Sequence, residues 1–176
     1  MKRLGTVLAV ASAAASLSAC AVFDEVSDVK RIKGLEATAG TPFTQALFQE
    51  YRASTAYESE VEVEWRDASV FARKGLRAAA GEAVPPEDPV HWRVPAARLD
   101  TLQAARARLL GYFADGATER VPGAAARAQV MYDCWVEEES ETNVDNGCRP
   151  AFLAIEPDLK KPAPVIQEVP DRALAA

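Results

Sequence analysis

Proline constrains the fold of this chain more than any other residue, because it ends helices and cannot donate a hydrogen bond to a sheet. The prolines that interrupt the apolar pattern form one group in the middle of the chain and one near its end: Pro85, Pro86 and Pro89, and Pro157, Pro162, Pro164 and Pro170. Elsewhere apolar side chains recur at helical spacing, and strand-like alternation is confined to residues 61–65, VEVEW. We therefore predict an all-α fold with two antiparallel helix pairs as its unit.

Four segments have the apolar spacing of an amphipathic helix. Thr41 is a suitable N-cap and Pro42 a suitable first residue for the first segment, and Gly81 is a suitable end for the second. The expected helices and their apolar stripes are residues 41–60 (Phe43, Leu47, Tyr51), 65–79 (Trp65, Ala68, Ala72, Leu76, Ala79), 96–114 (Leu99, Leu102, Leu109, Leu110, Phe113) and 123–140 (Val130, Met131, Cys134, Trp135). A short fifth helix or turn is expected after Cys148.

The second of these segments has a spacing found in a known repeat. Trp65, Ala68, Gly75 and Leu76 stand at offsets that resemble the second helix of a tetratricopeptide repeat. The preceding segment lacks the aromatic and glycine positions of that repeat, and no second copy follows at its period. Hairpins of similar shape are therefore the most that this spacing predicts.

Composition predicts one helical domain at residues 41–155, with irregular segments on both sides. Residues 20–40 are polar, charged and small without a sustained period, which is typical of a spacer. Residues 156–176 are polar and rich in proline. This composition predicts an extended tail that contributes nothing to a core.

The first twenty residues have the three parts of a secretory signal. Lys2 and Arg3 are basic, residues 4–17 are apolar and rich in alanine, and small residues precede Cys20. The apolar stretch is near the lower limit of the ~17–25 residues that span a bilayer, which favours a cleaved signal over a retained helix. We therefore expect residues 1–19 to be removed.

The motif Leu17-Ser18-Ala19-Cys20 resembles the bacterial lipobox, in which cleavage precedes a cysteine that is then acylated. The resemblance implies that Cys20 anchors the protein in a membrane, since several acyl chains exceed the marginal binding of a single chain. In such lipoproteins an aspartate after the cysteine commonly signals retention in the inner membrane. The residue here is Ala21, which implies the outer membrane, with the domain on its periplasmic face. An ordinary secretory signal with a chance cysteine is the alternative.

Lipidation of Cys20 would leave Cys134 and Cys148 as a pair in an oxidising compartment. Two thiols there most often form a structural disulfide, and closing a loop of about 15 residues would stabilise the fold by about 3 kcal/mol through loop-closure entropy. A redox role is the alternative, but oxidoreductases use the spacing C-x-x-C near a helix N-terminus. Here thirteen residues separate the cysteines, and Cys134 lies late in an expected helix.

The acidic side chains between the two cysteines raise the alternative of a calcium loop. An EF-hand loop needs glycine at position six and glutamate at position twelve. Counted from Glu141, position six is Asn146 and position twelve is Phe152, so the register fails. Residues 137–139 and Glu141 are predicted instead to form a solvated helix end, and residues 145–147 a tight turn. We expect no metal site and no cofactor.

Charge and motif content argue against other classes of function. The formal net charge of −6 becomes −8 once Lys2 and Arg3 are removed, so nucleic acid and anionic head groups are poor partners. His91 is the only histidine, and no catalytic motif surrounds it, so we do not expect an enzyme. A structural zinc site needs four nitrogen or sulfur ligands, which this chain does not offer in a recognisable pattern.

Three segments together resemble a known family: FTQALFQEYRASTAYESEVEVEWRDASVFARKGLRAAAG, AARLDTLQAARARLLGYFADGA and AARAQVMYDCWVEEESETNVDNGCRPAF. With the lipobox, they are similar to the N-terminal helical region of alphaproteobacterial OmpA-family outer-membrane lipoproteins, over residues 1–155. The resemblance implies the lipid anchor, the helical domain and the Cys134–Cys148 disulfide. Those relatives continue into an OmpA-like domain that binds peptidoglycan. No segment here resembles its T-D-x-x-G or N-x-x-L-S-x-x-R-A pattern, so direct peptidoglycan binding is not expected.

Two classes of function remain after these exclusions. The first is a non-enzymatic envelope protein that presents a helical scaffold to the periplasm, with an envelope protein as its candidate partner. The second is a periplasmic adaptor that docks a protein or peptide on its helix-pair surface, around Trp65, Trp92 and Trp135. Exposed tryptophans would favour the adaptor, and tryptophans packed inside would favour the scaffold.

Overall fold

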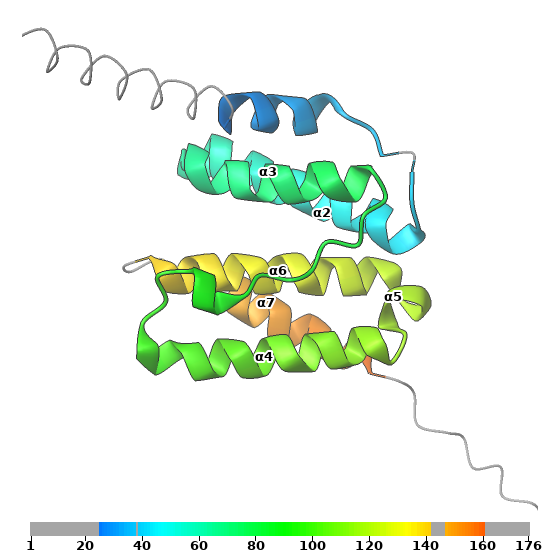
Figure 1. Ribbon diagram of the computed structural model, residues 1–176, viewed down its shortest axis with the longest axis vertical. Coiled ribbons are helices and arrows are strands. Elements are labelled where there is room, and N and C mark those ends of the chain that lie inside the picture. The colour runs from blue at the N-terminus through cyan, green and yellow to red at the C-terminus, as the bar shows by residue number, and fades with distance from the viewer. Residues whose placement is uncertain (1–24, 38, 142–146, 161–176) are drawn as a thin grey trace, which may run out of the picture.

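The computed structural model describes residues 25–37, 39–141 and 147–160, and the fold of these residues is all-α (Figure 1). The helices are α2 (Pro42–Tyr57), α3 (Trp65–Ala79), α4 (Ala96–Ala114), α5 (Ala117–Arg120), α6 (Pro122–Ser140) and α7 (Cys148–Ile155). Three shorter elements are η1 (Glu58–Glu62), η2 (Pro89–His91) and η3 (Glu156–Leu159). Residues 25–34 are helical as well, and no strand occurs in this part of the chain.

The long helices begin and end where the sequence predicts. The side-chain oxygen of Thr41 accepts a hydrogen bond from the backbone nitrogen of Thr44 at 3.2 Å, and Pro42 is the first residue of α2. Helix α3 ends before Gly81, whose φ of +91° is a left-handed conformation that glycine adopts without strain. The π-helical η1 continues α2 for one more turn, so that VEVEW forms a helix end and a connector.

Helix α6 lies at the centre of the arrangement. It contacts α2 on one side and α4, α5 and α7 on the other, while α2 also packs along α3. Figure 1 shows the connector between α3 and α4 crossing from one group of helices to the other. The largest completely buried side chains come from several helices, which indicates one shared core: Tyr51, Tyr132, Phe48, Phe71 and Phe152.

The prediction of a spacer at residues 20–40 is wrong for the described residues 25–34. These residues form a helix that lies against α2 and α3, and its Val29 and Ile32 are completely buried (Figure 1). Gly75 of α3 permits the close approach, because a Cβ atom there would lie 2.3 Å from Ile32 Cδ1. Val26, Val29 and Ile32 recur every three residues, but three apolar side chains among many charged ones are too short a pattern to indicate a buried face.

The predicted boundary of the C-terminal tail is also wrong at its start. Residues 156–159 form η3, and Leu159 is completely buried against the core. The rest of the predicted tail, residues 161–176, lies outside the described residues, as do the expected signal peptide, Cys20 and most of the turn at residues 145–147. None of the described helices has the length and apolar character needed to span a membrane.

Candidate functional site

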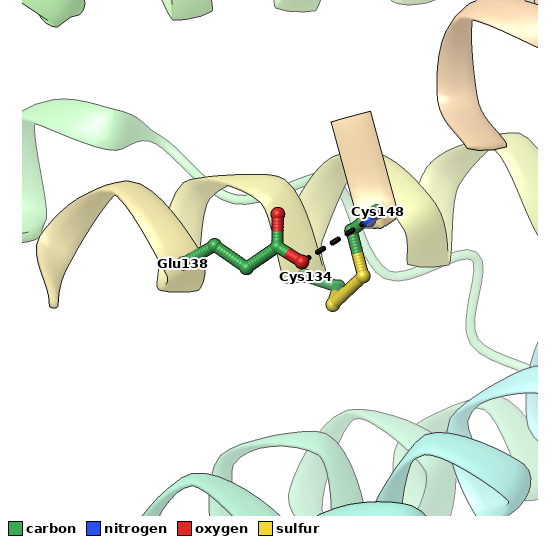
Figure 2. Close-up of side chains that lie close together, drawn as sticks. All are labelled: Cys134, Glu138 and Cys148. Carbon is green, nitrogen blue, oxygen red and sulfur yellow. Dashed lines mark hydrogen bonds between the residues drawn. A yellow bond between two sulfur atoms is a disulfide. The ribbon is translucent and has the colours of Figure 1, made fainter. Parts of the chain in front are cut away.

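The two cysteines of the predicted pair form a disulfide, which confirms that prediction. Cys134 lies on α6 and Cys148 is the first residue of α7, with their Cα atoms 5.7 Å apart. Figure 2 shows Glu138 beside the bridge, where its Oε1 accepts a hydrogen bond from the backbone nitrogen of Cys148 at 3.1 Å. The bridged sulfur atoms are not thiolates, so this group of two cysteines and a glutamate does not form a metal site.

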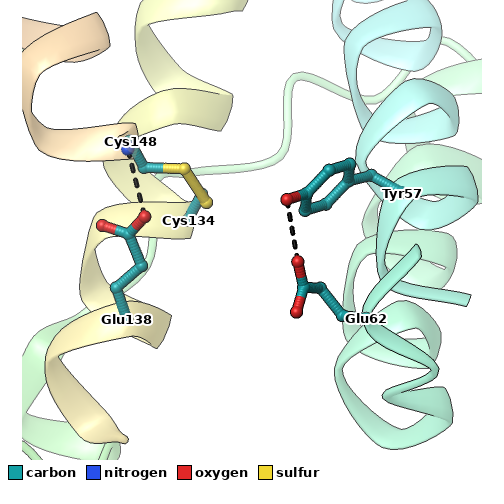
Figure 3. The surroundings of a disulfide bond; sticks show 5 residues. All are labelled: Tyr57, Glu62, Cys134, Glu138 and Cys148. Atoms are coloured by element: carbon teal, nitrogen blue, oxygen red, sulfur yellow. Dashed lines mark hydrogen bonds between the residues drawn. A yellow bond between two sulfur atoms is a disulfide. The ribbon is translucent and has the colours of Figure 1, made fainter. Parts of the chain in front are cut away.

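The other side of the disulfide faces the end of α2 and η1. Figure 3 shows Tyr57 and Glu62 there, and the Tyr57 hydroxyl donates a hydrogen bond to Glu62 Oε1 at 2.8 Å. Tyr57 and Glu62 are therefore hydrogen-bonded to each other and not to the disulfide. The disulfide therefore joins α7 to α6 without a hydrogen bond from either of these side chains.

The three tryptophans do not form one exposed surface, so the predicted docking surface is wrong in that form. Trp135 is only 3% exposed, because it packs between α6 and α7 against Tyr132 and Phe152. Trp92 is half-buried, and its Nε1 donates to Glu87 Oε2 at 2.9 Å. Trp65 is 38% exposed. Of the three tryptophans, Trp65 is the most exposed to solvent.

Three side chains from three helices meet in the interior, and we call them the central layer: Tyr51 of α2, Lys74 of α3 and Asp133 of α6. Asp133 Oδ2 accepts hydrogen bonds from the Tyr51 hydroxyl and from Lys74 Nζ, each at 2.6 Å. Tyr51 and Asp133 are completely buried, and Lys74 is nearly so. One buried carboxylate is therefore matched by one buried ammonium group, which offsets the cost of its burial.

The connector between α3 and α4 completes the bonding of the central layer. The backbone nitrogen of Glu87 donates to Asp133 Oδ1 at 2.7 Å, and Lys74 Nζ donates to Glu87 Oε1 at 2.9 Å. Arg106 of α4 fixes the same connector by donating from Nε to the carbonyl oxygen of Glu87 at 2.8 Å. The layer therefore joins α2, α3, α4 and α6 through one polar network.

Burial and hydrogen bonding act in opposite directions on the pKa values of this network. Burial raises the pKa of Asp133, and Lys74 offsets part of that effect. Burial also acts on Glu87, but Lys74 and Trp92 hold its pKa below the ordinary value. Burial and Asp133 raise the pKa of Tyr51, so its hydroxyl keeps its proton. The carboxylates of Glu87 and Asp133 are engaged within the fold, which favours a structural role for the layer.

A second group of acidic side chains lies toward the disulfide end of α6, and we call it the acidic layer: Glu58 of η1, Asp67 of α3, and Glu137 and Glu141 at the end of α6. One carboxylate oxygen each from Asp67, Glu137 and Glu141 lie within 4.8 Å of one another. Among the described residues, no lysine, arginine or histidine forms an ion pair with any of the four. The layer therefore brings four carboxyl groups together without a matching cation among the described residues.

The prediction of a solvated helix end is wrong for Glu137 and Glu138, which are both buried. Burial raises the pKa of Glu137 well above its ordinary range, and the charges of Glu141 and Glu58 add to the effect. Burial also raises the pKa of Glu58, to about 7, with Asp67 as the next cause. Tertiary packing of η1 and α3 against α6 produces this burial, and the acidic run alone does not reveal it.

An apolar cavity of about 570 Å³ opens at the opposite end of the molecule, between the start of α2 and the end of α4. Its walls include Phe43, Pro86, Leu110 and Phe113, and Gln129 of α6 reaches it from the interior. Gln129 Nε2 donates to the Tyr51 hydroxyl and the Val84 carbonyl, while its buried Oε1 has no hydrogen-bond partner within the described structure. The size is that of a small-ligand pocket.

Sequence reasoning missed both layers and the cavity, although one signal was present. Lys74, Asp133 and Glu137 interrupt otherwise apolar faces of their helices, and a charged residue on such a face is rarely buried without a partner. His91 is exposed, and Cys20 lies outside the described residues. No known protein-family model matches this chain, and no curated protein or solved structure shows significant similarity to it.

Proposed function

We propose that this chain is a non-enzymatic bacterial envelope lipoprotein, anchored in the outer membrane through acylated Cys20, that presents its helical domain to the periplasm. The observation that carries the proposal is the Cys134–Cys148 disulfide, because a structural disulfide is typical of an oxidising, exported compartment. The lipobox at residues 17–20 supports the same compartment from the other end of the chain. The proposal requires the anchor and the bridge to occur in one mature protein.

The absence of enzymatic activity is part of this proposal, and the central layer supports it. Its tyrosine, lysine and carboxylates are the groups from which a catalytic site would be assembled. Each of them is hydrogen-bonded to another member of the network: Tyr51, Lys74, Glu87 and Asp133. Because these groups stabilise one another in the interior, they are poorly placed to meet a substrate.

Processing and fractionation in a bacterial envelope test the proposal. Wild-type protein should be cleaved before Cys20 and fractionate with the outer membrane, and globomycin should block the cleavage. Cys20→Ala should leave an unprocessed precursor. Ala21→Asp should move the mature lipoprotein to the inner membrane, and Ala21→Ser is the matched control that should not. Normal processing of Cys20→Ala would contradict the anchor, and freely alkylated Cys134 and Cys148 in the mature protein would contradict the compartment.

A second candidate is a periplasmic adaptor that docks a protein or peptide partner, and the apolar cavity favours it. Leu110 forms part of the cavity wall and is 37% exposed, so an apolar side chain of a partner would contact it. Crosslinking and pull-down from envelopes should recover a partner with wild-type protein and lose it with Leu110→Glu. Leu153→Glu is the matched control, because Leu153 is 44% exposed on α7 and does not line this cavity. Equal recovery with both variants would rule out the cavity as the docking site.

A further inference from the structure

We propose that the acidic layer binds a divalent cation, namely Ca²⁺, through the carboxylates of Asp67, Glu137 and Glu141. Asp67 lies on α3, Glu137 on α6 and Glu141 directly after α6, and one oxygen of each lies within 4.8 Å of the others. Ca²⁺ binds oxygen ligands at about 2.3–2.6 Å, so donors around one ion are separated by at most about 5 Å. The carboxylate oxygens therefore already have the spacing that a common calcium ligand set requires.

An unbonded carboxylate oxygen points independently to a ligand at this position. Glu137 is only 3% exposed, and its Oε2 has no hydrogen-bond partner among the described residues. Buried polar atoms nearly always have a partner, and an unsatisfied one indicates strain, a bound water or a bound ion. Because the neighbouring groups are carboxylates, a cation satisfies this oxygen and the negative charge around it together.

The surrounding charges are mostly negative. Glu62 of η1 and Glu64 before α3 add carboxylates beside the layer, and Arg66 is the basic group that acts on Asp67. Asp67 and Glu141 also line a cavity of about 420 Å³, together with Arg66, His91 and Arg93, which connects the layer with solvent. No basic group of this cavity forms an ion pair with the three carboxylates in the described part of the chain. The net field at the layer therefore attracts a cation.

The donor set selects the kind of cation. Three carboxylates supply up to six oxygens when they bind through both atoms, and Ca²⁺ accepts six to eight oxygens in irregular geometry. Mg²⁺ requires near-octahedral ligands at about 2.0–2.1 Å and retains its waters, which fits a set of bulky carboxylates less well. Softer metals prefer nitrogen and sulfur, and both sulfur atoms nearby are held in the disulfide.

Binding is coupled to proton release, because protons and Ca²⁺ compete for the same oxygens. A carboxylate must lose its proton before it can ligate a cation, so bound protons and bound Ca²⁺ exclude each other at these oxygens. Apparent affinity should therefore rise with pH, and binding should acidify a weakly buffered solution.

Calorimetry and thermal unfolding of the full chain, purified in detergent and stripped with EDTA, test this inference with CaCl₂ alone. We expect a dissociation constant of about 10⁻⁵ to 10⁻³ M, as in calcium sensors and extracellular modules, and a melting temperature raised by about 3–5 °C at a tenfold excess over that constant. MgCl₂ should bind at least about tenfold more weakly. An unchanged melting temperature and no binding heat with about 10 mM CaCl₂ would overturn the inference, and equal binding of Mg²⁺ would overturn the choice of Ca²⁺.

Glu137→Gln is the variant that separates ligation from general electrostatic attraction. It should bind Ca²⁺ at least about tenfold more weakly than wild type, because a neutral amide replaces a carboxylate ligand. Asp67→Asn, on the other helix, should weaken binding similarly. The matched control is Glu64→Gln, which removes a nearby exposed charge outside the ligand set and should change affinity less than about threefold. Equal losses in Glu64→Gln and Glu137→Gln, or no loss in Glu137→Gln and Asp67→Asn, would refute ligation.

These tests do not depend on the lipid anchor. Failure of Cys20 processing would leave calcium binding intact, and absence of calcium binding would leave the outer-membrane location intact. The two proposals can therefore fail separately. Together they would describe an envelope protein whose disulfide-bridged end is stabilised by the ion.

Discussion

The central layer and the acidic layer occupy neighbouring levels of the same helices. Glu58 follows Tyr51 by seven residues along α2 and η1, Asp67 precedes Lys74 by seven along α3, and Glu137 follows Asp133 by four along α6. Seven residues of helix rise about 10.5 Å. In one layer a lysine balances the buried carboxylate, and in the other an aspartate stands where the lysine would be. The same packing therefore produces a closed network at one level and an uncompensated acidic group at the next.

This difference shows that burial alone does not decide whether a carboxylate is structural. Asp133 is completely buried and has three donors, whereas Glu137 is nearly as buried and has one oxygen without any hydrogen-bond partner within the described residues. A satisfied buried network stabilises a unique arrangement, and an unsatisfied one costs free energy until a ligand or proton arrives. The two layers can be compared directly by mutation, because each has a member on α3 and on α6.

The largest effect is expected when the central layer is made to resemble the acidic layer. Lys74→Met leaves the carboxylates of Asp133 and Glu87 without their ammonium partner, so the free energy of unfolding should fall by about 3–5 kcal/mol. Chemical denaturation measures the change. Arg77→Met is the matched control on the same helix, since Arg77 forms an exposed pair with Glu82, and it should cost less than about 1 kcal/mol.

A second substitution distinguishes lost charge balance from lost packing in that experiment. Asp133→Leu in the Lys74→Met background removes the uncompensated carboxylate and should recover part of the lost stability. If the double variant is as unstable as the sum of the two single variants, the layer does not act through charge pairing. The comparison between the layers would then concern shape rather than electrostatics.

Removal of the disulfide should weaken the acidic layer more than the central one. The bridge holds α7 on α6 beside Glu138, the neighbour of Glu137, so replacing Cys134 and Cys148 with alanine should lower the free energy of unfolding by about 2–4 kcal/mol. Hydrogen exchange should then accelerate in α7 and the last turn of α6, while α2 and α3 stay protected. Uniform acceleration throughout the chain would contradict a local role for the bridge.

The sequence predicts the elements of this fold better than the relation between them. Helix bounds such as those of α4 follow from the apolar period and proline, and the disulfide follows from counting cysteines in an oxidising compartment. Neither layer could be predicted in this way, because Lys74 and Asp133 stand 59 residues apart and each alone resembles a solvated side chain. The buried helix at residues 25–34 could not be predicted for the same reason, since its burial depends on packing against distant residues such as Gly75.

The acidic layer should also give the protein an unusual dependence on pH. Folding raises the pKa of Glu58 from 4.5 to about 7, so the folded state binds a proton that the unfolded state releases. This contribution to stability is fully present below about pH 4.5 and is lost as the pH rises through about 7. Glu58→Gln should remove this pH dependence. It should stabilise the protein by about 1–3 kcal/mol at pH 8, where the wild-type side chain is ionised, and have almost no effect at pH 4. Denaturation at a series of pH values, without divalent cations, measures the difference, and a constant gain across the series would contradict the shift.

The smallest effect on stability is expected from a substitution at Glu64. This substitution tests whether the two layers differ because their carboxylates are buried or because the acidic layer has more negative charges. Its exposed carboxylate raises the pKa values of Glu58, Asp67 and Glu141 from a distance. Glu64→Gln should therefore stabilise the protein by less than about 0.5 kcal/mol at neutral pH, and the gain should vanish in about 0.5 M NaCl because salt screens exposed charges. The gain from Glu58→Gln should persist in the same salt, since a buried repulsion is screened much less. Equal gains from the two variants, lost equally in salt, would mean that the acidic layer differs from the central layer only in the number of its negative charges.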